Sequence, residues 1–533
     1  MPGVCSRIAW RTAALLSLCQ AFGLAADWPQ YRGPTTDGIS PESISTTWPV
    51  SGPTLVWTNG SLTNGFSTFA VSQGRAFTLI SKRAGGTLRE YCVAVDAGTG
   101  ANLWETPIDL APWVPEAAIN GGEGAVGYNT GDGPRTTPAI SGDHVIAFSG
   151  ALKLVCLNAS SGSVVWSNDL RSSMGGSIII YENAASPCLD NDLVFVNLNS
   201  STNNRNLVAF RVADGSVAWS SQNELVTHTT PIIATIHGVR QVIFATVTGL
   251  VSLDRTTGAF LWKYTYPFYP IGTSMGASPV VYSNIVYCTA SYGRGAAAAR
   301  INLSSGNWSV QHLYLKTGSN YRSIWMTPVC YEGYIYTLCG DNVTFLTTPL
   351  NCIEMSTGNL MWSTNGFGMG GLILVGTNLL VLKENGRLVL AQPSPAGYQE
   401  LASYQAFQFS TNAPGKCWIS PAFSNGRIYV RSTRGGVCLD ASVAAMGSLK
   451  LLTPRLLNST QLQLWVTTAD GSPIDSGRLA KIELREAGSP DLDPLTWPKL
   501  TNQLALDPSG QAQTTITINS GPSRRFYRAV ELP

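Results

Sequence analysis

Apolar residues along this chain fall into short runs that turn residues interrupt, and the arrangement recurs many times. Runs of about four to eight such residues, bounded by Gly, Pro, Asn or Asp, are typical of β-strands joined by tight turns. In six places a small residue and a proline open the run, at Pro138, Pro187, Pro231, Pro279, Pro328 and Pro421. The spacing between these prolines is roughly 44 to 49 residues, with one double gap. A regular period of this length predicts a repeat fold.

Each repeat contains four predicted strands. The unit that begins at Pro421 has a hairpin signal at Asn425-Gly426 and a third strand in GGVCLDAS. In other units a glycine followed four residues later by tryptophan marks the fourth strand. These pairs are Gly100/Trp104, Gly162/Trp166, Gly215/Trp219, Gly258/Trp262 and Gly358/Trp362. The segment GMGGLILVGTNLLVLKENGRLVL fills the double gap and GFSTFAVSQGRAFTLI begins an earlier copy. The sequence therefore predicts an all-β, eight-bladed β-propeller.

One fourth strand stands apart from any unit. The segment SGPTLVWTNG, residues 51–60, precedes the first complete repeat, whereas the last repeat ends in GVCLDASVAAMG without a fourth strand. An unclosed ring of sheets would expose strand edges to other chains. We therefore predict that the strand around Leu55–Trp57 pairs with the strand around Val437–Asp440 and closes the propeller.

The remaining segments complete the predicted organisation: a signal peptide over 1–26, an N-terminal extension over 27–52, the propeller over 53–446 and a small C-terminal β-sandwich over 447–533. Arg7 and Arg11 precede the apolar run AALLSLCQAFGLA, and small residues follow it, as in export signals. After residue 447, segments such as STQLQLWVTT alternate polar and apolar residues at strand spacing. We expect a periplasmic or secreted protein without a transmembrane segment.

Charge and cysteine content narrow the possible partners. Charged residues make up 12% of the chain and the net charge is +2, so no general attraction to nucleic acid is expected. Nine cysteines follow the predicted signal peptide. Cys156, Cys352 and Cys438 occupy, in separate repeats, a position that is small in most other repeats, with Arg300 as the exception. Equivalent positions in different blades are too far apart for a disulfide, which predicts buried free thiols.

The segment AVDAGTGANLW, residues 94–104, resembles the tryptophan-docking motif of the pyrroloquinoline-quinone-type propeller repeat. The segments DWPQYRGPTTDG, residues 27–38, and GDGPRTTPAI, residues 131–140, are similar to a group of secreted bacterial proteins that carry these repeats. In that family each tryptophan ring docks on the neighbouring blade beside a small residue and the glycine. The resemblance therefore implies a structural docking role for Trp57, Trp104, Trp166, Trp219, Trp262 and Trp362.

The same resemblance implies two kinds of function. Quinoprotein alcohol dehydrogenases of the family hold pyrroloquinoline quinone and calcium at the top of the channel, with an adjacent cysteine pair and Glu, Asn and Asp residues. This sequence has no Cys-Cys dipeptide, and Glu182-Asn183 is a short match that also suits a solvated loop. The other branch resembles the outer-membrane assembly propeller, which binds proteins and catalyses no reaction.

Candidate ligand-binding residues lie just before the anchoring prolines, because loops at one end of a propeller surround its channel and commonly carry function. They are Arg135, His228, Trp325 and Trp418, together with Arg294 in a glycine-rich loop. Packing and loop hydrogen bonding are the alternative roles of these residues. A long glycine-rich insertion, predicted over Thr106–Arg135, would cover one end of the channel. No catalytic residue and no metal ligand is predicted.

The sequence favours a monomeric, exported propeller without a cofactor that binds a protein or cell-envelope component through its loop face. A pyrroloquinoline-quinone-dependent alcohol or sugar dehydrogenase, with calcium, is the alternative. A carbohydrate-binding accessory protein is the second alternative.

Overall fold

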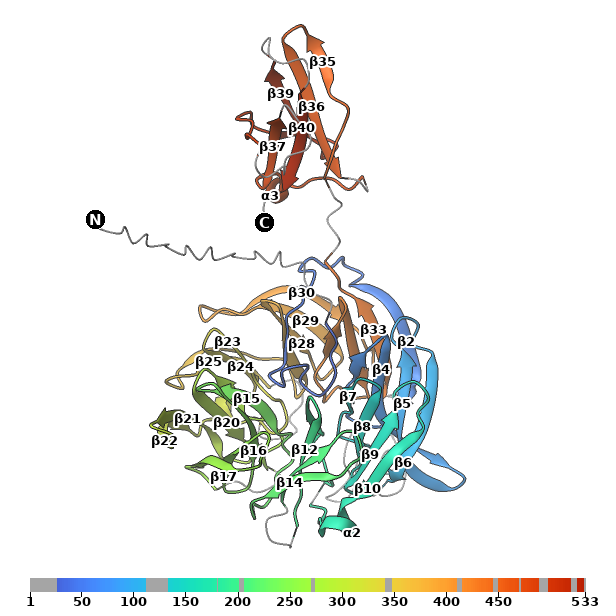
Figure 1. The fold of residues 1–533 in the computed structure, drawn as a ribbon, viewed down its shortest axis with the longest axis vertical. Coiled ribbons are helices and arrows are strands. Elements are labelled where there is room, and N and C mark those ends of the chain that lie inside the picture. The colour runs from blue at the N-terminus through green and yellow to red at the C-terminus, as the bar shows by residue number, and fades with distance from the viewer. Residues whose placement is uncertain are drawn as a thin grey trace, which may run out of the picture. The chain divides into compact units, whose positions relative to one another are not determined.

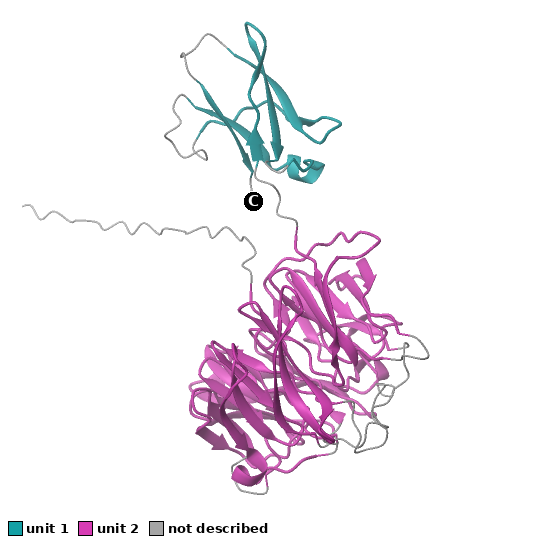
Figure 2. Ribbon diagram, turned by 90° about the vertical axis from the view of Figure 1, so that its right-hand side faces the viewer, with its two compact units in different colours: residues 1–22, 444–533 teal, residues 23–443 magenta. Residues whose placement is uncertain are grey.

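A computed structural model gives the fold of the chain. It describes residues 26–111, 133–179, 181–200, 206–269, 274–340, 348–409, 415–443, 449–468, 471–487, 497–518 and 525–531. The predicted signal peptide, apart from Ala26, lies outside the described residues. Two compact units are present, one of residues 23–443 and one whose described residues run from 449 to 531 (Figure 2). No helix in these ranges is long and apolar enough to cross a membrane.

Eight antiparallel sheets follow one another around a ring in the described part of the larger unit, and we call them blades 1 to 8 (Figure 1). Blade 1 consists of β3 (Ala70–Ser72), β4 (Arg75–Ala84), β5 (Thr87–Asp96) and β6 (Asn102–Leu110). Blade 2 consists of β7 (Ala139–Ser141), β8 (His144–Phe148), β9 (Lys153–Asn158) and β10 (Val164–Asp169). Blade 3 consists of β11 (Cys188–Asp190), β12 (Leu193–Asn197), β13 (Leu207–Arg211) and β14 (Val217–Ser221). Blade 4 consists of β15 (Ile232–Ile236), β16 (Val239–Ala245), β17 (Gly249–Asp254) and β18 (Phe260–Thr265).

The second half of the ring repeats this order. Blade 5 consists of β19 (Val280–Tyr282), β20 (Ile285–Ala290), β21 (Gly295–Ser304) and β22 (Asn307–Lys316). Blade 6 consists of β23 (Val329–Tyr331), β24 (Tyr334–Leu338), β25 (Leu350–Glu354) and β26 (Leu360–Thr364). Blade 7 consists of β27 (Gly371–Val375), β28 (Asn378–Leu382), β29 (Arg387–Gln392) and β30 (Gln399–Gln405), with β1 (Ile39–Ser40) added beside β27. Blade 8 consists of β31 (Ala422–Ser424), β32 (Arg427–Ser432), β33 (Arg434–Asp440) and β2 (Thr54–Thr63).

The apolar core lies between the blades rather than at the centre of the ring. One cluster joins Phe77 and Val145 of blades 1 and 2, for example, and another joins Val286 of blade 5 to Ile243 of blade 4. The first strands of most neighbouring blades contact one another and so surround the axis. Because each sheet buries both faces against its neighbours, its inner strands are nearly continuous apolar runs.

Most of the repeated tryptophans reach across to the next blade. The indole Nε1 of Trp57 donates to the carbonyl oxygen of Ala97 at 3.0 Å, and that of Trp104 donates to Ala159 at 3.0 Å. Trp166, Trp219 and Trp362 donate in the same way to Val212, Arg255 and Ser394. Each of the six tryptophans also stands opposite the small residue of its own sheet, as Trp104 does with Ala94. This contact explains why cysteine, alanine or serine fills that position.

Two blades depart from this arrangement. Trp262 packs among blade 5 residues, but its indole donates to Gln241 of its own blade at 2.6 Å. In blade 5 the residue that reaches onward is Tyr314, whose hydroxyl donates to the carbonyl of Met355. Tyr314 stands opposite Ala298, so Arg300 is not the equivalent of the small residue in the other blades. The alignment that put Arg300 there was wrong because the β21–β22 hairpin is longer than its counterparts.

The ring is joined by strands from the two ends of the unit. Strand β2 pairs antiparallel with β33, with Leu55 opposite Leu439 and Trp57 opposite Cys438. The segment SGPTLVWTNG therefore supplies the outer strand of the last blade. The nine described cysteines are all buried and free.

The N-terminal segment, residues 27–45, lies along the first strands of the blades. Its hydrogen-bond partners are Val71, Ile140, Leu189, Ile233, Pro328, Leu374 and Gly426, which belong, in the described structure, to every blade but blade 5. Trp28, Gln30 and Arg32 are at most 3% exposed. Gly376 and Gly426 lie in hairpins between first and second strands. The segment thus fills the channel at its hairpin end, a role that the sequence did not indicate.

The insertion between blades 1 and 2 is shorter than predicted. Strand β6 continues through Thr106 to Leu110, paired with β5, so the residues after Thr106 extend a strand instead of opening a loop. Residues 112–132 lie outside the described residues. Helical segments are short: α2 (Leu170–Met174) and η2 (Ser319–Tyr321) in the propeller and α3 (Ser476–Leu479) in the second unit.

The second unit consists of two antiparallel sheets that share one apolar core. The first sheet contains β34 (Leu449–Leu451), β35 (Arg455–Asn458), β36 (Gln461–Thr468), β38 (Ala505–Leu506) and β39 (Ala512–Thr517). The second contains β37 (Ile482–Ala487) and β40 (Phe526–Glu531). Leu464 and Ile516 of the first sheet and Leu484 of the second belong to the same buried cluster. Two small sheets packed face to face form a β-sandwich.

Candidate functional site

The loops that precede the first strands lie at the end of those strands opposite their hairpins, and we call this end the mouth. The repeat gives one equivalent position in each blade, the third residue before the anchoring proline. Blades 1 and 7 lack the proline, and alignment of their hairpins gives Phe66 and Met369. In blade order the eight occupants are Phe66, Arg135, Ala184, His228, Gly276, Trp325, Met369 and Trp418.

The side chains at these eight positions differ in type and in exposure. Three aromatic side chains, from blades 6, 8 and 1, are partly exposed, while Met369 of blade 7 is 1% exposed and buried in the core. Arg135 and His228 follow in blades 2 and 4, with Ala184 between them in blade 3 and Gly276 after them in blade 5. The mouth therefore has an aromatic side and a polar side on an otherwise regular scaffold.

On the aromatic side, Trp325 and Trp418 come together, with ring centroids 4.7 Å apart at 40°. Phe66 stacks on Trp418 at 5.3 Å. The indole of Trp418 donates to the Glu384 carboxylate at 2.7 Å, and that of Trp325 donates to the Met369 carbonyl at 3.3 Å. The Lys416 ammonium lies 4.0 Å from the centroid of the Trp418 ring, within the range of a cation–π interaction.

On the polar side, Arg135 belongs to a buried cluster of acidic residues. Its guanidinium donates to the Tyr181 carbonyl at 3.2 Å and lies 3.7 Å from the Glu182 carboxylate. Glu90, which is fully buried, accepts hydrogen bonds from the backbone N–H of Gly150. Burial raises the pKa of Glu90 to about 8 and that of Glu182 to about 6, and Arg135 opposes the rise in both.

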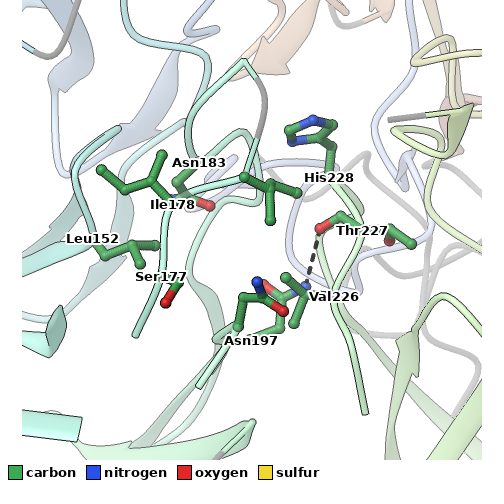
Figure 3. Close-up of a pocket in the computed structure, with 10 residues that line it drawn as sticks. Leu152, Ser177, Ile178, Asn183, Asn197, Val226, Thr227 and His228 are labelled. Atoms are coloured by element: carbon green, nitrogen blue, oxygen red, sulfur yellow. Dashed lines mark hydrogen bonds between the residues drawn. The ribbon is translucent and has the colours of Figure 1, made fainter. Parts of the chain in front are cut away.

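His228 lies beside this cluster. Its ring centroid is 6.4 Å from that of Tyr181, and its backbone N–H donates to the Met275 carbonyl, which ties blade 4 to blade 5. The imidazole borders a small hollow with a cavity volume of about 10 Å³. Figure 3 shows Asn183, Asn197 and Thr227 around the same hollow, with the amide of Asn197 bonded to Thr227.

Arg294 stands apart from the other candidates. It lies in the turn between β20 and β21, where its backbone N–H donates to Ser291. Among the described interactions it contacts none of the other four residues. The structure thus brings Trp325 to Trp418, and it brings Arg135 to the carbonyl and His228 to the ring of Tyr181, but the described contacts do not join all five residues in one cluster.

Several residues at the mouth were missed by sequence reasoning. Phe66 escaped because blade 1 lacks the proline that marked the other loops, although aligning the repeats would have found it. Glu384, Lys416 and Tyr181 lie in loops without a repeated pattern. Only their contacts with Trp418 and Arg135 reveal them.

Glu182 and Asn183, the short match to the quinone-binding family, already have partners in this structure. The Asn183 amide donates to the Ser149 carbonyl and accepts from the Ala185 N–H, and Glu182 faces Arg135, so both residues have partners in loops of blade 2. In the part of the chain that the structure describes, no three or more His, Cys, Asp or Glu side chains are grouped to hold a metal ion. We therefore assign no quinone chemistry to these residues.

Comparison with known proteins bears on the fold. The family model described as "Outer membrane protein assembly factor BamB" matches residues 88–321. A comparison with curated protein sequences gives no match. Among solved structures, a quinohemoprotein alcohol dehydrogenase from Comamonas testosteroni is 15% identical, with a TM-score of 0.54, over 81% of this chain and 82% of that one.

Two further structures are similarly distant in sequence. The quinohemoprotein alcohol dehydrogenase ADHIIG from Pseudomonas putida HK5 is 13% identical, with a TM-score of 0.52, over 81% of this chain and 84% of that one. BamB from Moraxella catarrhalis is 15% identical, with a TM-score of 0.48, over 73% of this chain and 99% of that one. The family match, the shared fold and the repeated tryptophan contacts support a propeller built of pyrroloquinoline-quinone-like repeats.

Proposed function

We propose that the protein is an exported propeller that binds a partner protein, or another cell-envelope component, through its mouth and catalyses no reaction. Export follows from the pattern of the first 26 residues. Binding through the mouth follows from the loops there, which are held by rigid blades and differ from one blade to the next.

The observation that carries this proposal is the filled channel. Trp28, Gln30 and Arg32 are buried against the first strands of the blades, to which they are hydrogen-bonded. The hollow beside His228 has a cavity volume of about 10 Å³, which is room for about one water molecule and not for a small-molecule ligand. A shallow surface with aromatic and cationic side chains suits a macromolecular partner, whose interface anchors are commonly aromatic residues and arginine.

The likeness to two alcohol dehydrogenases makes quinone-dependent oxidation the competing function. It predicts that purified protein binds pyrroloquinoline quinone with calcium and reduces an artificial dye in the presence of an alcohol or sugar. Stoichiometric binding with turnover would overturn the proposal in favour of this enzyme.

Photocrosslinking in the producing cells tests the binding proposal directly. A photoreactive phenylalanine analogue replaces Tyr292, which is 41% exposed in the β20–β21 turn, or Phe260, which is 52% exposed on an outer strand. Ser291, the neighbour of Tyr292, bonds to Ser274 in the loop before blade 5, which places this turn at the mouth. We expect a discrete protein adduct from position 292 and none from position 260. Equal adduct yields at the two positions, or no adduct from position 292, would contradict the binding proposal.

A further inference from the structure

We propose that the signal peptide is cleaved between Ala25 and Ala26, and that the α-ammonium group created on Ala26 pairs with the buried carboxylate of Glu42. This inference rests on export, which is part of the proposed function, and adds a processing site and a role for the group that processing creates. We call the pair of Ala26 and Glu42 the N-terminal clasp, because it closes the N-terminal segment into a loop.

The N-terminal segment ends beside the place where it begins. Trp28 exchanges two backbone hydrogen bonds with Val71 in the first strand of blade 1, at 2.9 and 2.7 Å. Glu42 lies at the turn between β31 and β32 in blade 8. Strands β3 and β31, the first strands of blades 1 and 8, contact each other. The ring therefore brings the two ends of the segment together.

Backbone donors hold the Glu42 carboxylate in a fixed position. It accepts from the N–H of Asn425 at 3.0 Å and from that of Gly426 at 2.9 Å, and the residue is 4% exposed. Both donors have left-handed backbones, as in the tight Asn-Gly turns of hairpins. The backbone N–H of Ala26 faces the same carboxylate. The nitrogen that cleavage converts into an ammonium thus already lies at Glu42.

This carboxylate needs a compensating charge. Burial raises the pKa of Glu42, the three backbone N–H groups oppose the rise, and the neighbouring Asp27 carboxylate adds to it. In the part of the chain that the structure describes, no lysine, arginine or histidine forms an ion pair with Glu42. A buried carboxylate without a cation is unfavourable. An α-ammonium on Ala26 supplies the cation.

The sequence independently favours this cleavage position. Signal peptidases select small residues in an A-x-A-like pattern, one and three positions before the cleaved bond. Cleavage after Ala25 places Ala25 and Gly23 there, whereas cleavage after Ala26, the end of the predicted signal peptide, places Leu24 at the third position. Hydrolysis adds one water across the bond, so that Ala25 leaves with a carboxylate and the nitrogen of Ala26 becomes an ammonium.

Mass spectrometry of the exported protein tests the processing site. The full chain, with its own signal peptide, is expressed in a bacterium and recovered from the periplasm or the medium. We expect the protein to begin at Ala26 with an unmodified amine. A protein that keeps Met1 would contradict both this inference and the export in the proposed function. Another first residue, such as Asp27, would contradict this inference alone.

Trypsin tests the clasp on purified mature protein. Arg32 is 2% exposed, so cleavage after it requires the N-terminal segment to open. One form of the protein begins at Ala26, and a second carries Gly-Ser before Ala26, which turns the ammonium into an amide. We expect cleavage after Arg32 to be about tenfold faster in the extended form, because a hydrogen bond between two charged groups is lost.

Variants at Glu42 separate the clasp from other effects of the extension. In Glu42→Gln the two forms should be cleaved at equal rates, because no charge remains for the ammonium to pair with. Glu332→Gln, at an exposed residue in the turn between β23 and β24, should keep the tenfold difference. Glu42→Asp keeps the charge and should keep part of the difference, and melting temperatures report whether each variant is folded.

Two results would overturn the clasp while leaving the proposed function in place. One is an equal rate of cleavage after Arg32 in the two forms with native Glu42. The other is a difference of the same size in folded Glu42→Gln, because the extension then acts through a group other than this carboxylate.

Discussion

The guanidinium of Arg431 in blade 8 donates a hydrogen bond to the carbonyl oxygen of Leu79 in blade 1, at 2.7 Å. The same fully buried side chain also donates to the carbonyls of Ser67 and Leu62, at 2.9 and 3.1 Å, and to the Thr78 hydroxyl at 2.7 Å. Arg431 thus bonds the last blade to the first at the junction where β2 joins the ring.

Replacing this side chain should weaken the junction. Arg431→Met leaves several buried acceptors without a donor, which costs about 3 kcal/mol or more in the free energy of unfolding. The stability of Arg431→Lys should lie between those of the native protein and Arg431→Met, because an ammonium has fewer donors than the guanidinium group. Denaturant unfolding measures the change. Exposed Arg434 of the same blade is the control, and Arg434→Ala should change stability by about 0.5 kcal/mol or less. Equal losses of stability in Arg431→Met and Arg434→Ala would contradict the role of Arg431 at the junction.

The close approach of Trp104 to Gly162 leads to a second prediction, for which Gly142 of the same blade provides the control. A Cβ on Gly162 would lie 2.6 Å from the Trp104 ring, whereas a Cβ on Gly142 would meet nothing within 4 Å. Both glycines have left-handed backbones, so alanine costs about 1–2 kcal/mol at either site. Gly162→Ala should cost about 1–3 kcal/mol more than Gly142→Ala, because the indole must shift. Thermal unfolding of the two variants checks the difference.

Buried acids should make stability depend on pH. The pKa of Glu90 is about 8 in the folded protein, above its ordinary value of 4.5, so the folded state holds more protons than the unfolded state between these values. Its contribution is therefore complete below about pH 4.5 and lost as the pH rises through 8, with a slope of at most about 1.4 kcal/mol per pH unit. Glu182, whose pKa burial raises to about 6, should add a further loss of stability as the pH rises from about 4.5 through 6.

Glu90→Gln keeps the side chain neutral and removes its part of this dependence. We expect the variant to gain stability relative to the native protein as the pH increases from 5 to 9, measured by urea unfolding in steps of one pH unit. An unchanged slope would show that Glu90 is already ionised in the folded protein.

The N-terminal segment should stabilise the ring from within. Gln30 exchanges two hydrogen bonds with the backbone of Leu189, at 3.0 and 2.7 Å, and is 3% exposed. Gln30→Ala leaves both backbone groups unpaired and should cost about 2 kcal/mol. Thr35, which is exposed in the same segment, provides the control. Limited proteolysis should then cut the segment in Gln30→Ala sooner than in Thr35→Ala.

The cysteines should resist modification until the protein unfolds. All nine in the described structure are buried, and burial raises the pKa of Cys352 to about 11 and that of Cys156 to about 12. At pH 8 iodoacetamide should label almost none of them in native protein and all nine in denaturant without a reductant. Mass spectrometry counts the adducts, and a deficit of two in denaturant would reveal a disulfide.

The repeat allowed much of the propeller to be predicted. The unpaired segment around Trp57 indicated its partner near Cys438 because a missing strand and a spare strand have the same pattern. The equivalent of Ala94 in blade 5 was misplaced at Arg300 because the hairpin there is longer. Sequence periodicity indicates strands and turns, but it misaligns residues where one repeat has a hairpin of a different length.

The mouth was predicted only in part. The position of Trp325 and Trp418 before their prolines was readable, but their contact depends on the buried side chain of Met369 in the blade between them. Glu384 and Gln30 act through contacts between segments far apart in the sequence, with no local pattern. Such contacts become visible only when the ring is assembled.

The order in which the chain is made has a consequence for how the propeller forms. Residues 54–63 are synthesised before every complete blade, yet their partners are residues 434–440. Strand β2 therefore has no partner until nearly the whole unit has emerged. Contacts so distant in sequence form slowly, and an exposed edge invites aggregation in the meantime. Assembly of this protein is thus expected to be slow, dependent on chaperones and most sensitive to changes in β2.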